Sequence, residues 1–87
     1  MRINGIGDAA ATNLADALKS NKTLTELNLC YNLIWEAGAE RLADALKSNT
    51  ALTRLYLSGN EIRIEGLAGL KRTSESNKKL RVDLFSL

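Results

Sequence analysis

Charged, amide and aromatic side chains alternate with leucines in two short segments, residues 24–32 and 52–60. Alternation with a period of two is typical of a strand that buries one face and shows the other to solvent. These side chains offer hydrogen bonds, ion pairs and aromatic contact. Tyrosine and arginine are enriched among the residues that dominate protein interfaces; the alternative role is ordinary polar cover of a short sheet. The outward positions are Glu26, Asn28, Cys30, Tyr31, Arg54, Tyr56 and Ser58.

Catalytic and metal-binding chemistry has little support in the sequence. The chain has no histidine and a single cysteine, so Cys30 has no histidine to activate it and no partner for an intrachain disulfide. No acidic cluster has calcium-loop spacing, and Gly5-Ile6-Gly7 matches neither a phosphate loop nor a full dinucleotide fingerprint. We therefore expect a protein that is not an enzyme and that holds no metal or cofactor.

A 28-residue repeat must position the outward side chains. The octapeptide LADALKSN occurs at residues 14–21 and 42–49, and the pattern LxxLxLxxNxI returns with the same offset. This spacing indicates stacked units of one strand and one helix, which form a parallel sheet with one layer of helices. We expect strands at residues 27–29 and 55–57 and helices at residues 10–19 and 37–48. The whole chain, residues 1–87, is predicted to be one domain with units 1–23, 24–51 and 52–79 and a degenerate last unit, 80–87.

Side chains one period apart should lie on neighbouring strands. We expect Glu26 beside Arg54, as an ion pair worth ~0.2 to 1 kcal/mol if exposed. Asn28 is expected beside Tyr56.

Trp35 is the only tryptophan, and Gly7 and Arg63 occupy its position in the flanking units. The repeat itself therefore does not require an aromatic ring there. Two roles remain open for Trp35: an anchor in an interface, or a ring packed across the neighbouring loop.

Two sets of asparagines recur with the repeat. One set follows the strands, where we expect a buried ladder that satisfies backbone groups instead of a binding site: Asn4, Asn32 and Asn60. The other set follows the helices, where we expect a left-handed backbone that stops each helix: Asn21, Asn49 and Asn77.

The last unit departs from the repeat. Its segment LRVDLFSL lacks one residue, so Val82 and Leu84 arrive one position early, Phe85 would point outward and Leu87 would take the ladder position. Such a unit is either a cap or a ragged edge.

Both ends of the stack are thinly covered. Only residues 1–3 remain of a strand before Asn4, and Ser74 stands where Leu18 and Leu46 point inward. An open sheet edge invites pairing with another chain. We expect a homodimer through an open end, most readily the C-terminal one.

Composition narrows the partner classes. Twelve Lys and Arg against ten Asp and Glu leave a net charge of +2, too balanced for a typical nucleic-acid or membrane-surface protein. No apolar run approaches the ~20 residues that span a bilayer, and no secretory signal opens the chain. We expect no nucleic-acid or membrane partner, and a cytoplasmic location fits the single cysteine. A small basic patch lacks the aromatic interleaving of a single-strand binder: Lys71, Arg72, Lys78, Lys79 and Arg81.

The pattern LxxLxLxxNxI followed by IxxxGAxxLAxALKxN, clearest in residues 34–49, resembles the ribonuclease-inhibitor-type leucine-rich repeat. That subclass occurs in ribonuclease inhibitor, NOD-like receptors and Ran GTPase-activating protein. The resemblance implies an α/β solenoid, a short right-handed horseshoe segment with the parallel sheet on its concave face and helices on its convex face. It also implies that a protein partner docks on the strands and adjoining loops. The predicted partner-binding residues are Glu26, Asn28, Tyr31, Trp35, Arg54 and Tyr56.

Three functions are consistent with these patterns. The first is a non-catalytic protein-interaction module that binds through the sheet and its loops. The second is a GTPase-activating-type regulator fragment, suggested only by the similarity to Ran GTPase-activating protein. The third is a structural segment that self-associates.

Overall fold

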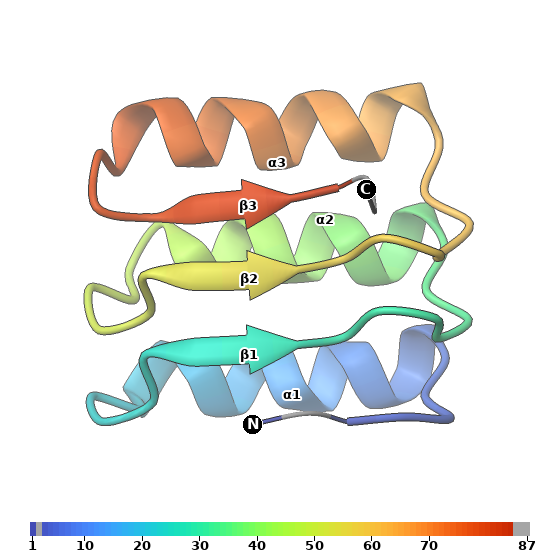
Figure 1. The fold of residues 1–87 in the computed structure, drawn as a ribbon, viewed down its shortest axis with the longest axis horizontal. Helices are drawn as coiled ribbons and strands as arrows, with labels where there is room; N and C mark the ends of the chain where they lie inside the picture. The colour runs from blue at the N-terminus through green and yellow to red at the C-terminus, as the bar shows by residue number, and fades with distance from the viewer. Residues whose placement is uncertain (2, 85–87) are drawn as a thin grey trace.

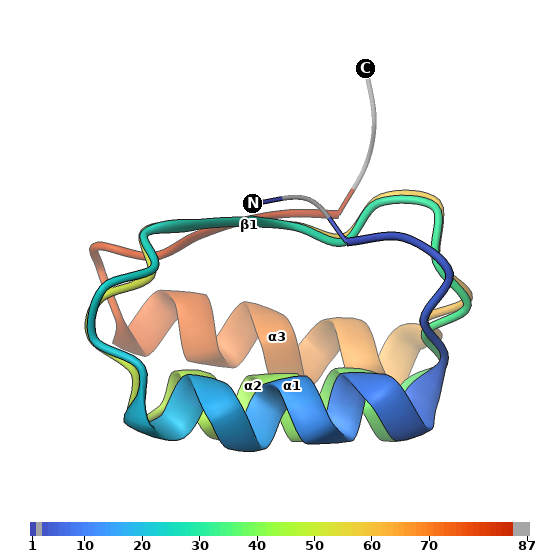
Figure 2. The same ribbon diagram turned by 90° about the horizontal axis from the view of Figure 1, so that it is seen from below.

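The protein folds into two layers, a sheet and a row of helices (Figures 1 and 2). The computed structural model describes residues 1 and 3–84. Within them, three strands form one parallel sheet in the order β1-β2-β3, as the repeat predicts. Helices alternate with strands along the chain: α1 (Asp8–Ser20), β1 (Glu26–Asn28), α2 (Glu36–Leu46), β2 (Arg54–Tyr56), α3 (Ile64–Ser76) and β3 (Arg81–Asp83). The predicted α/β fold is therefore confirmed, with bounds that differ from expectation by one or two residues.

The register of the sheet shows where the repeat loses a residue. Leu27 pairs with Leu55, and Leu55 pairs with Val82. The first offset is 28 residues and the second is 27, so the last unit is shorter by one residue, as predicted. Phe85 and Leu87 lie outside the described residues.

The core lies between the layers and is thinner at the C-terminal end. Leu27 and Leu55 are fully buried, and α1 and α2 bury Ala11, Ala15, Leu18, Ala39, Leu42 and Leu46 against them. In α3 the only fully buried apolar side chain is Leu70, because Ser74 occupies the place of Leu46. Gly38 permits the close approach of α1 to α2, since a Cβ there would lie only 3.1 Å from the Cβ of Ala11.

The asparagine ladder has two members, and the prediction for Asn4 is wrong. The backbone N–H groups of Ile6 and Ile34 donate to the side-chain oxygens of Asn32 and Asn60, so Ile6 and Ile34 are equivalent. The Asn32 side chain donates to the carbonyl of Ile3, as Asn60 does to that of Leu29.

This equivalence explains why Asn4 is exposed. Two residues separate Ile3 from Ile6, whereas four separate Leu29 from Ile34. The shorter first loop has no room for a ladder asparagine.

The asparagines after the helices act through their side chains, which corrects the expected left-handed stop. Asn21 and Asn77 have φ of −76° and −111°, and among the described residues other than glycine only Tyr31 has a positive φ. Instead, the Asn21 oxygen accepts from the backbone of Thr23 and Leu24. Such local bonds turn the chain toward the next strand.

Asn49 makes more side-chain hydrogen bonds than Asn21 and Asn77, its equivalents in the other units. The sequence did not predict that it joins two units. It is buried, and its amide donates to the carbonyls of Leu18 and Asn21 in the preceding unit. Its oxygen accepts from Ala51 and Leu52. Asn49 therefore joins two units at the end of the sheet opposite to Asn32.

Candidate functional site

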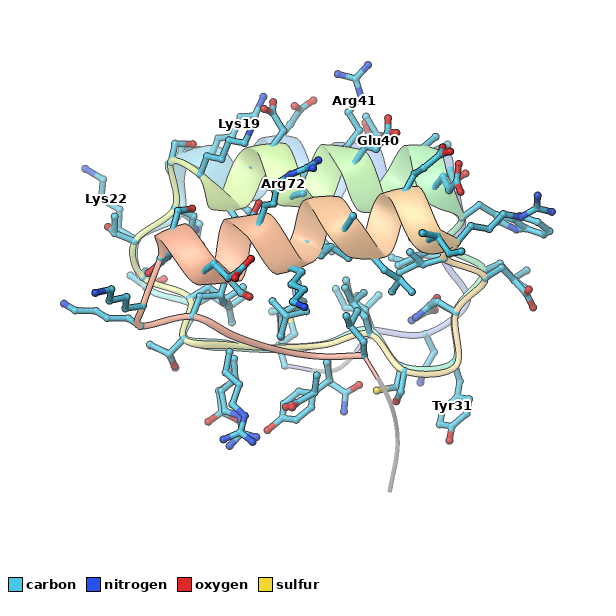
Figure 3. The ribbon with its side chains drawn as sticks, turned by 90° about the horizontal axis from the view of Figure 1, so that it is seen from above. Lys19, Lys22, Tyr31, Glu40, Arg41 and Arg72 are labelled. Carbon is cyan, nitrogen blue, oxygen red and sulfur yellow. The ribbon has the colours of Figure 1, made fainter. Side chains whose placement is uncertain are left out.

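The four predicted strand residues share the outer face of the sheet, on the side away from the helices. Glu26 lies beside Arg54 and Asn28 beside Tyr56, as the repeat predicts. Leu27 and Leu55, between them, point into the core. Side chains project from this face of the sheet in Figure 3. We call Glu26, Asn28, Arg54 and Tyr56, together with Arg81 and Asp83 of β3, the strand face.

Arg54 pairs with Asp83 and not with Glu26, which corrects the predicted ion pair. Its Nη2 lies 3.1 Å from Oδ2 of Asp83, on the strand opposite to Glu26. No ion pair between Glu26 and Arg54 forms among the described residues. The 28-residue spacing did not predict the contact with Asp83, because the one-residue deletion in the last unit brings Asp83 within reach of Arg54.

Two further contacts fix the Arg54 guanidinium on the strand face. It lies over the ring of Tyr56, 5.1 Å from the ring centroid, a cation–π arrangement. The hydrogen bond to Asp83 and then the proximity of Tyr56 raise the pKa of Arg54, so it is always charged. Asp83 also lies 3.6 Å from Nε of Arg81. The strand face thus presents an oriented cation on an aromatic platform.

Cys30 and Ser58 are buried, contrary to their predicted outward positions. Their side chains meet across neighbouring units, with 3.0 Å between Sγ and Oγ. Both residues come after their strands, because β1 ends at Asn28 and β2 at Tyr56. The alternation of inward and outward side chains therefore does not extend to them. They contribute to packing between units.

Tyr31 is exposed but held in an unusual conformation. Its φ is 57°, its side chain is 66% exposed, and its ring lies against Gly59. Gly59 is its repeat equivalent and has a φ of 78°. This turn therefore demands a left-handed residue, which costs about 1 to 2 kcal/mol for any side chain with a Cβ.

Trp35 packs its ring against the neighbouring loop, which is one of the two roles left open by the sequence, and the ring remains partly exposed. Its ring is 46% exposed, and the Arg63 guanidinium of the next unit lies 5.9 Å from the ring centroid. Two neighbours that the sequence did not single out, Leu33 and Ile64, are 65% and 82% exposed. We call Tyr31, Leu33, Trp35 and Ile64 the loop edge, because they lie where strands lead into helices.

Asp8 positions Trp35 from the preceding unit. One Asp8 oxygen accepts from the backbone N–H of Trp35 at 2.7 Å and from that of Gly38 at 3.1 Å. Trp35 is the N-cap of α2 and has no capping side chain of its own. Glu36, which is also acidic, occupies the position equivalent to Asp8 in the second unit. This recurrence was the signal in the sequence for the capping role of Asp8.

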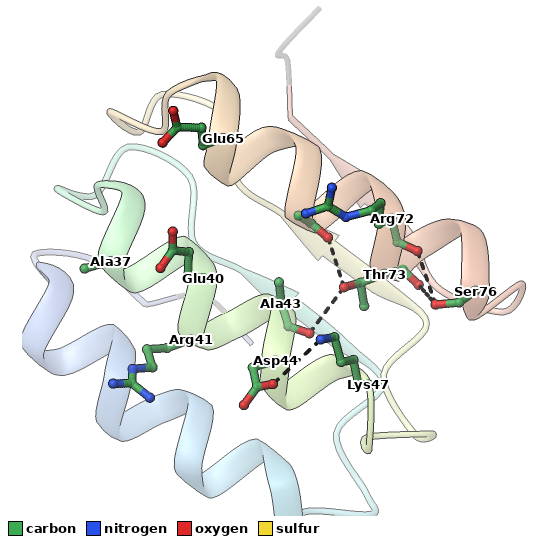
Figure 4. A pocket seen from close by; sticks show the side chains of 11 residues that line it. Ala37, Glu40, Arg41, Ala43, Asp44, Lys47, Glu65, Arg72, Thr73 and Ser76 are labelled. Atoms are coloured by element: carbon green, nitrogen blue, oxygen red, sulfur yellow. Dashed lines mark hydrogen bonds and ion pairs between the residues drawn. The ribbon is translucent and has the colours of Figure 1, made fainter.

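A shallow groove of about 820 Å³ lies between α2 and α3 on the helix layer. Figure 4 shows the charged side chains that line it: Glu40, Arg41, Asp44 and Lys47 from α2 and its C-cap, and Glu65 and Arg72 from α3. Of these, only Glu65 lies in the first turn of its helix, where the helix dipole stabilises it. Three acidic and three basic side chains line the groove, so their charges balance.

No group of three His, Cys, Asp or Glu side chains among the described residues is arranged to hold a metal ion. No described helix is long and apolar enough to cross a bilayer.

Comparison with known proteins agrees with the repeat architecture. The profile described as "Leucine Rich repeat" matches residues 20–43 and 48–71. No curated protein matches the chain. Among solved structures, leiomodin-1 actin-binding site 2 is similar, with a TM-score of 0.78 and 27% sequence identity. The similar region covers 93% of this chain and 48% of that one, so this chain spans about half of that structure.

Proposed function

Because the chain belongs to the leucine-rich repeat family, we propose that it is a protein-binding module that contacts its partner through the strand face and the loop edge. The observation that supports this most directly is the Arg54–Tyr56 stack, held by Asp83 in the centre of the strand face. We assign the contacts to Glu26, Asn28, Tyr31, Trp35, Arg54 and Tyr56.

Preorganisation is the physical reason for this choice. A free arginine side chain loses rotamer freedom when it binds, which costs roughly 0.5 to 1.5 kcal/mol. Arg54 has already lost that freedom to Asp83 and Tyr56, so a partner carboxylate or carbonyl meets an oriented donor. Arginine, tyrosine and tryptophan are also the residues that most often dominate interface energetics.

We further propose that the repeats are of the ribonuclease-inhibitor-like subclass. Helices of 13, 11 and 13 residues in α1, α2 and α3 support it. A full helix in each unit is the feature that the resemblance implies.

Actin is the first partner to test, because the similar leiomodin structure is an actin-binding site. We expect the chain to bind monomeric actin in isothermal titration calorimetry, and Arg54→Ala and Tyr56→Ala each to weaken binding by about tenfold or more. Arg41→Ala on α2, away from the strand face, serves as the matched control. Binding that survives both strand-face variants would refute the proposed surface.

A second test does not depend on knowing the partner. A photoreactive residue at position 56 should crosslink a protein from cell extract, whereas the same residue at position 41 should not. Equal crosslinking at both positions, or none at position 56, contradicts the proposal.

Self-association is the second function that we propose, and a specific observation favours it. An apolar groove of about 370 Å³ lies at the C-terminal end of the stack, between α3 and β3. Ile64, Leu67 and Leu84 line it. The groove lies apart from Arg54 and Tyr56, but it shares Ile64 with the loop edge.

A further inference from the structure

We propose that two copies of this chain pair edge to edge through β3, antiparallel, about a two-fold axis at Val82. The inference rests on the proposed self-association and specifies its geometry. It follows from the hydrogen-bonding pattern of β3, from the charges beside Val82 and from the apolar groove beneath it.

The backbone of Val82 faces the open edge of the sheet. Arg81 donates its N–H to Thr53, and Asp83 accepts from the N–H of Leu57, so both neighbours of Val82 point toward β2. Successive residues of a strand point their backbone groups in opposite directions within the sheet plane. Val82 therefore offers one N–H and one C=O to another strand.

Antiparallel pairing about Val82 is self-complementary in charge. The two Val82 residues exchange both N–H···O bonds, which places Arg81 directly opposite Asp83 of the second copy. This arrangement occurs twice because of the two-fold symmetry. Parallel pairing in register would instead place Arg81 opposite Arg81, so the sequence Arg-Val-Asp selects the antiparallel orientation.

The side chains are available for this exchange. Arg81 is 73% exposed and makes only a 3.6 Å ion pair with Asp83 of its own strand. Asp83 is held on the outer face of the sheet by Arg54 of β2, at 3.1 Å, so Arg81 of a second copy would share a carboxylate whose position is already fixed.

The groove between α3 and β3 continues the interface on the inner side of the sheet. Ile64 and Leu67 line it from α3, and Val82 and Leu84 line it from the C-terminal segment. Ile64 is the most exposed large apolar side chain in the described part of the chain. Antiparallel pairing sets Val82 against Val82 and Leu84 against Leu80 of the second copy, so apolar area is buried on both copies.

The N-terminal end is better covered, which directs pairing to β3. Ile3 donates to the carbonyl of Asn28, and Asn28 donates to the carbonyl of Met1. These bonds cover the outer side of β1. Beyond β3, the described residues supply no equivalent cover.

Sedimentation velocity of the 87-residue chain tests the association itself. We expect a concentration-dependent shift from monomer to dimer between micromolar and millimolar concentrations. A chain that stays monomeric throughout overturns both the self-association and its geometry. Assembly beyond the dimer contradicts two-fold closure.

Charge variants test the geometry separately. Arg81→Asp leaves two acidic residues on the edge and Asp83→Lys leaves two basic ones, so each variant alone should raise the dimer dissociation constant by about tenfold. Mixed together, the two variants should form a heterodimer, because opposite charges again face each other. This recovery also shows that both variants are folded, including Asp83→Lys, which loses the Arg54 contact.

Val82→Pro tests the backbone contact. It removes the N–H at the open edge, while the bonds of β3 to β2 at Arg81 and Asp83 remain, so it should abolish the dimer without unfolding the chain. Val82→Ala trims the side chain, keeps the N–H, and should retain part of the association. A wild-type dimer that persists in Val82→Pro, or charge variants that fail to recover on mixing, overturns the geometry while leaving self-association itself intact.

Discussion

The ring of Tyr31 lies against Gly59, the residue that occupies the same position one repeat later. A Cβ at Gly59 would fall on the ring atoms of Tyr31. Both residues have a left-handed backbone, so two neighbouring units solve the same turn with different side chains. The two positions are therefore energetically coupled.

Gly59→Ala should be strongly destabilising, and less so without the tyrosine. The left-handed backbone alone should cost about 1 to 2 kcal/mol, and the collision of the new methyl group with the Tyr31 ring adds to it. In a Tyr31→Gly background only the backbone cost should remain. Urea unfolding of the four proteins forms a double-mutant cycle. Equal costs of Gly59→Ala in both backgrounds would show that the ring moves aside freely.

Asp8→Ala should destabilise the protein by about 1 kcal/mol, because α2 loses its capping side chain. The two hydrogen bonds that Asp8 accepts cross from one unit to the next, so the loss weakens their stacking. Asp8→Asn keeps an acceptor oxygen and should cost less. Asp16→Ala on α1 is the control, since Asp16 forms only an exposed 3.9 Å ion pair. Thermal or urea unfolding measures both variants. If Asp8→Ala is as stable as Asp16→Ala, or more stable, the capping role is excluded.

Asn32→Ala and Asn4→Ala should differ, although the repeat places both residues at one position. Asn32 is 3% exposed and serves backbone groups of Ile3, Ile6 and Leu29, so its removal should cost roughly 1 to 3 kcal/mol. Asn4 is exposed, and its substitution should change stability by less than about 0.5 kcal/mol. Chemical denaturation measures both. Similar losses would mean that the first loop contains a ladder asparagine after all.

Leu55→Ala should cost more than Leu84→Ala. Leu55 is fully buried on the central strand, and truncating such a leucine costs ~2 to 5 kcal/mol. Leu84 is half-buried beside the open groove and has fewer neighbours to lose. The two unfolding free energies, measured in urea at low protein concentration, decide the order. Equal losses would indicate that the C-terminal unit packs as a complete cap.

The amino-acid sequence by itself determined the architecture. Identical octapeptides in equivalent surroundings adopt the same helix in α1 and α2, and leucines at a spacing of two place β1 and β2 in register. The deletion in LRVDLFSL even predicted the 27-residue offset of Val82. These features depend on periodicity, which a sequence displays directly.

Only the tertiary structure decided which side chains meet. Arg54 lies between Glu26 and Asp83 on the neighbouring strands and pairs with Asp83. Asn4 is not in the ladder because the first loop is shorter by two residues. Asp8 caps a helix in another unit because the close approach at Gly38 brings α1 and α2 together. Such contacts depend on distances of a few tenths of an ångström across units, and repeat spacing does not encode distances of that size.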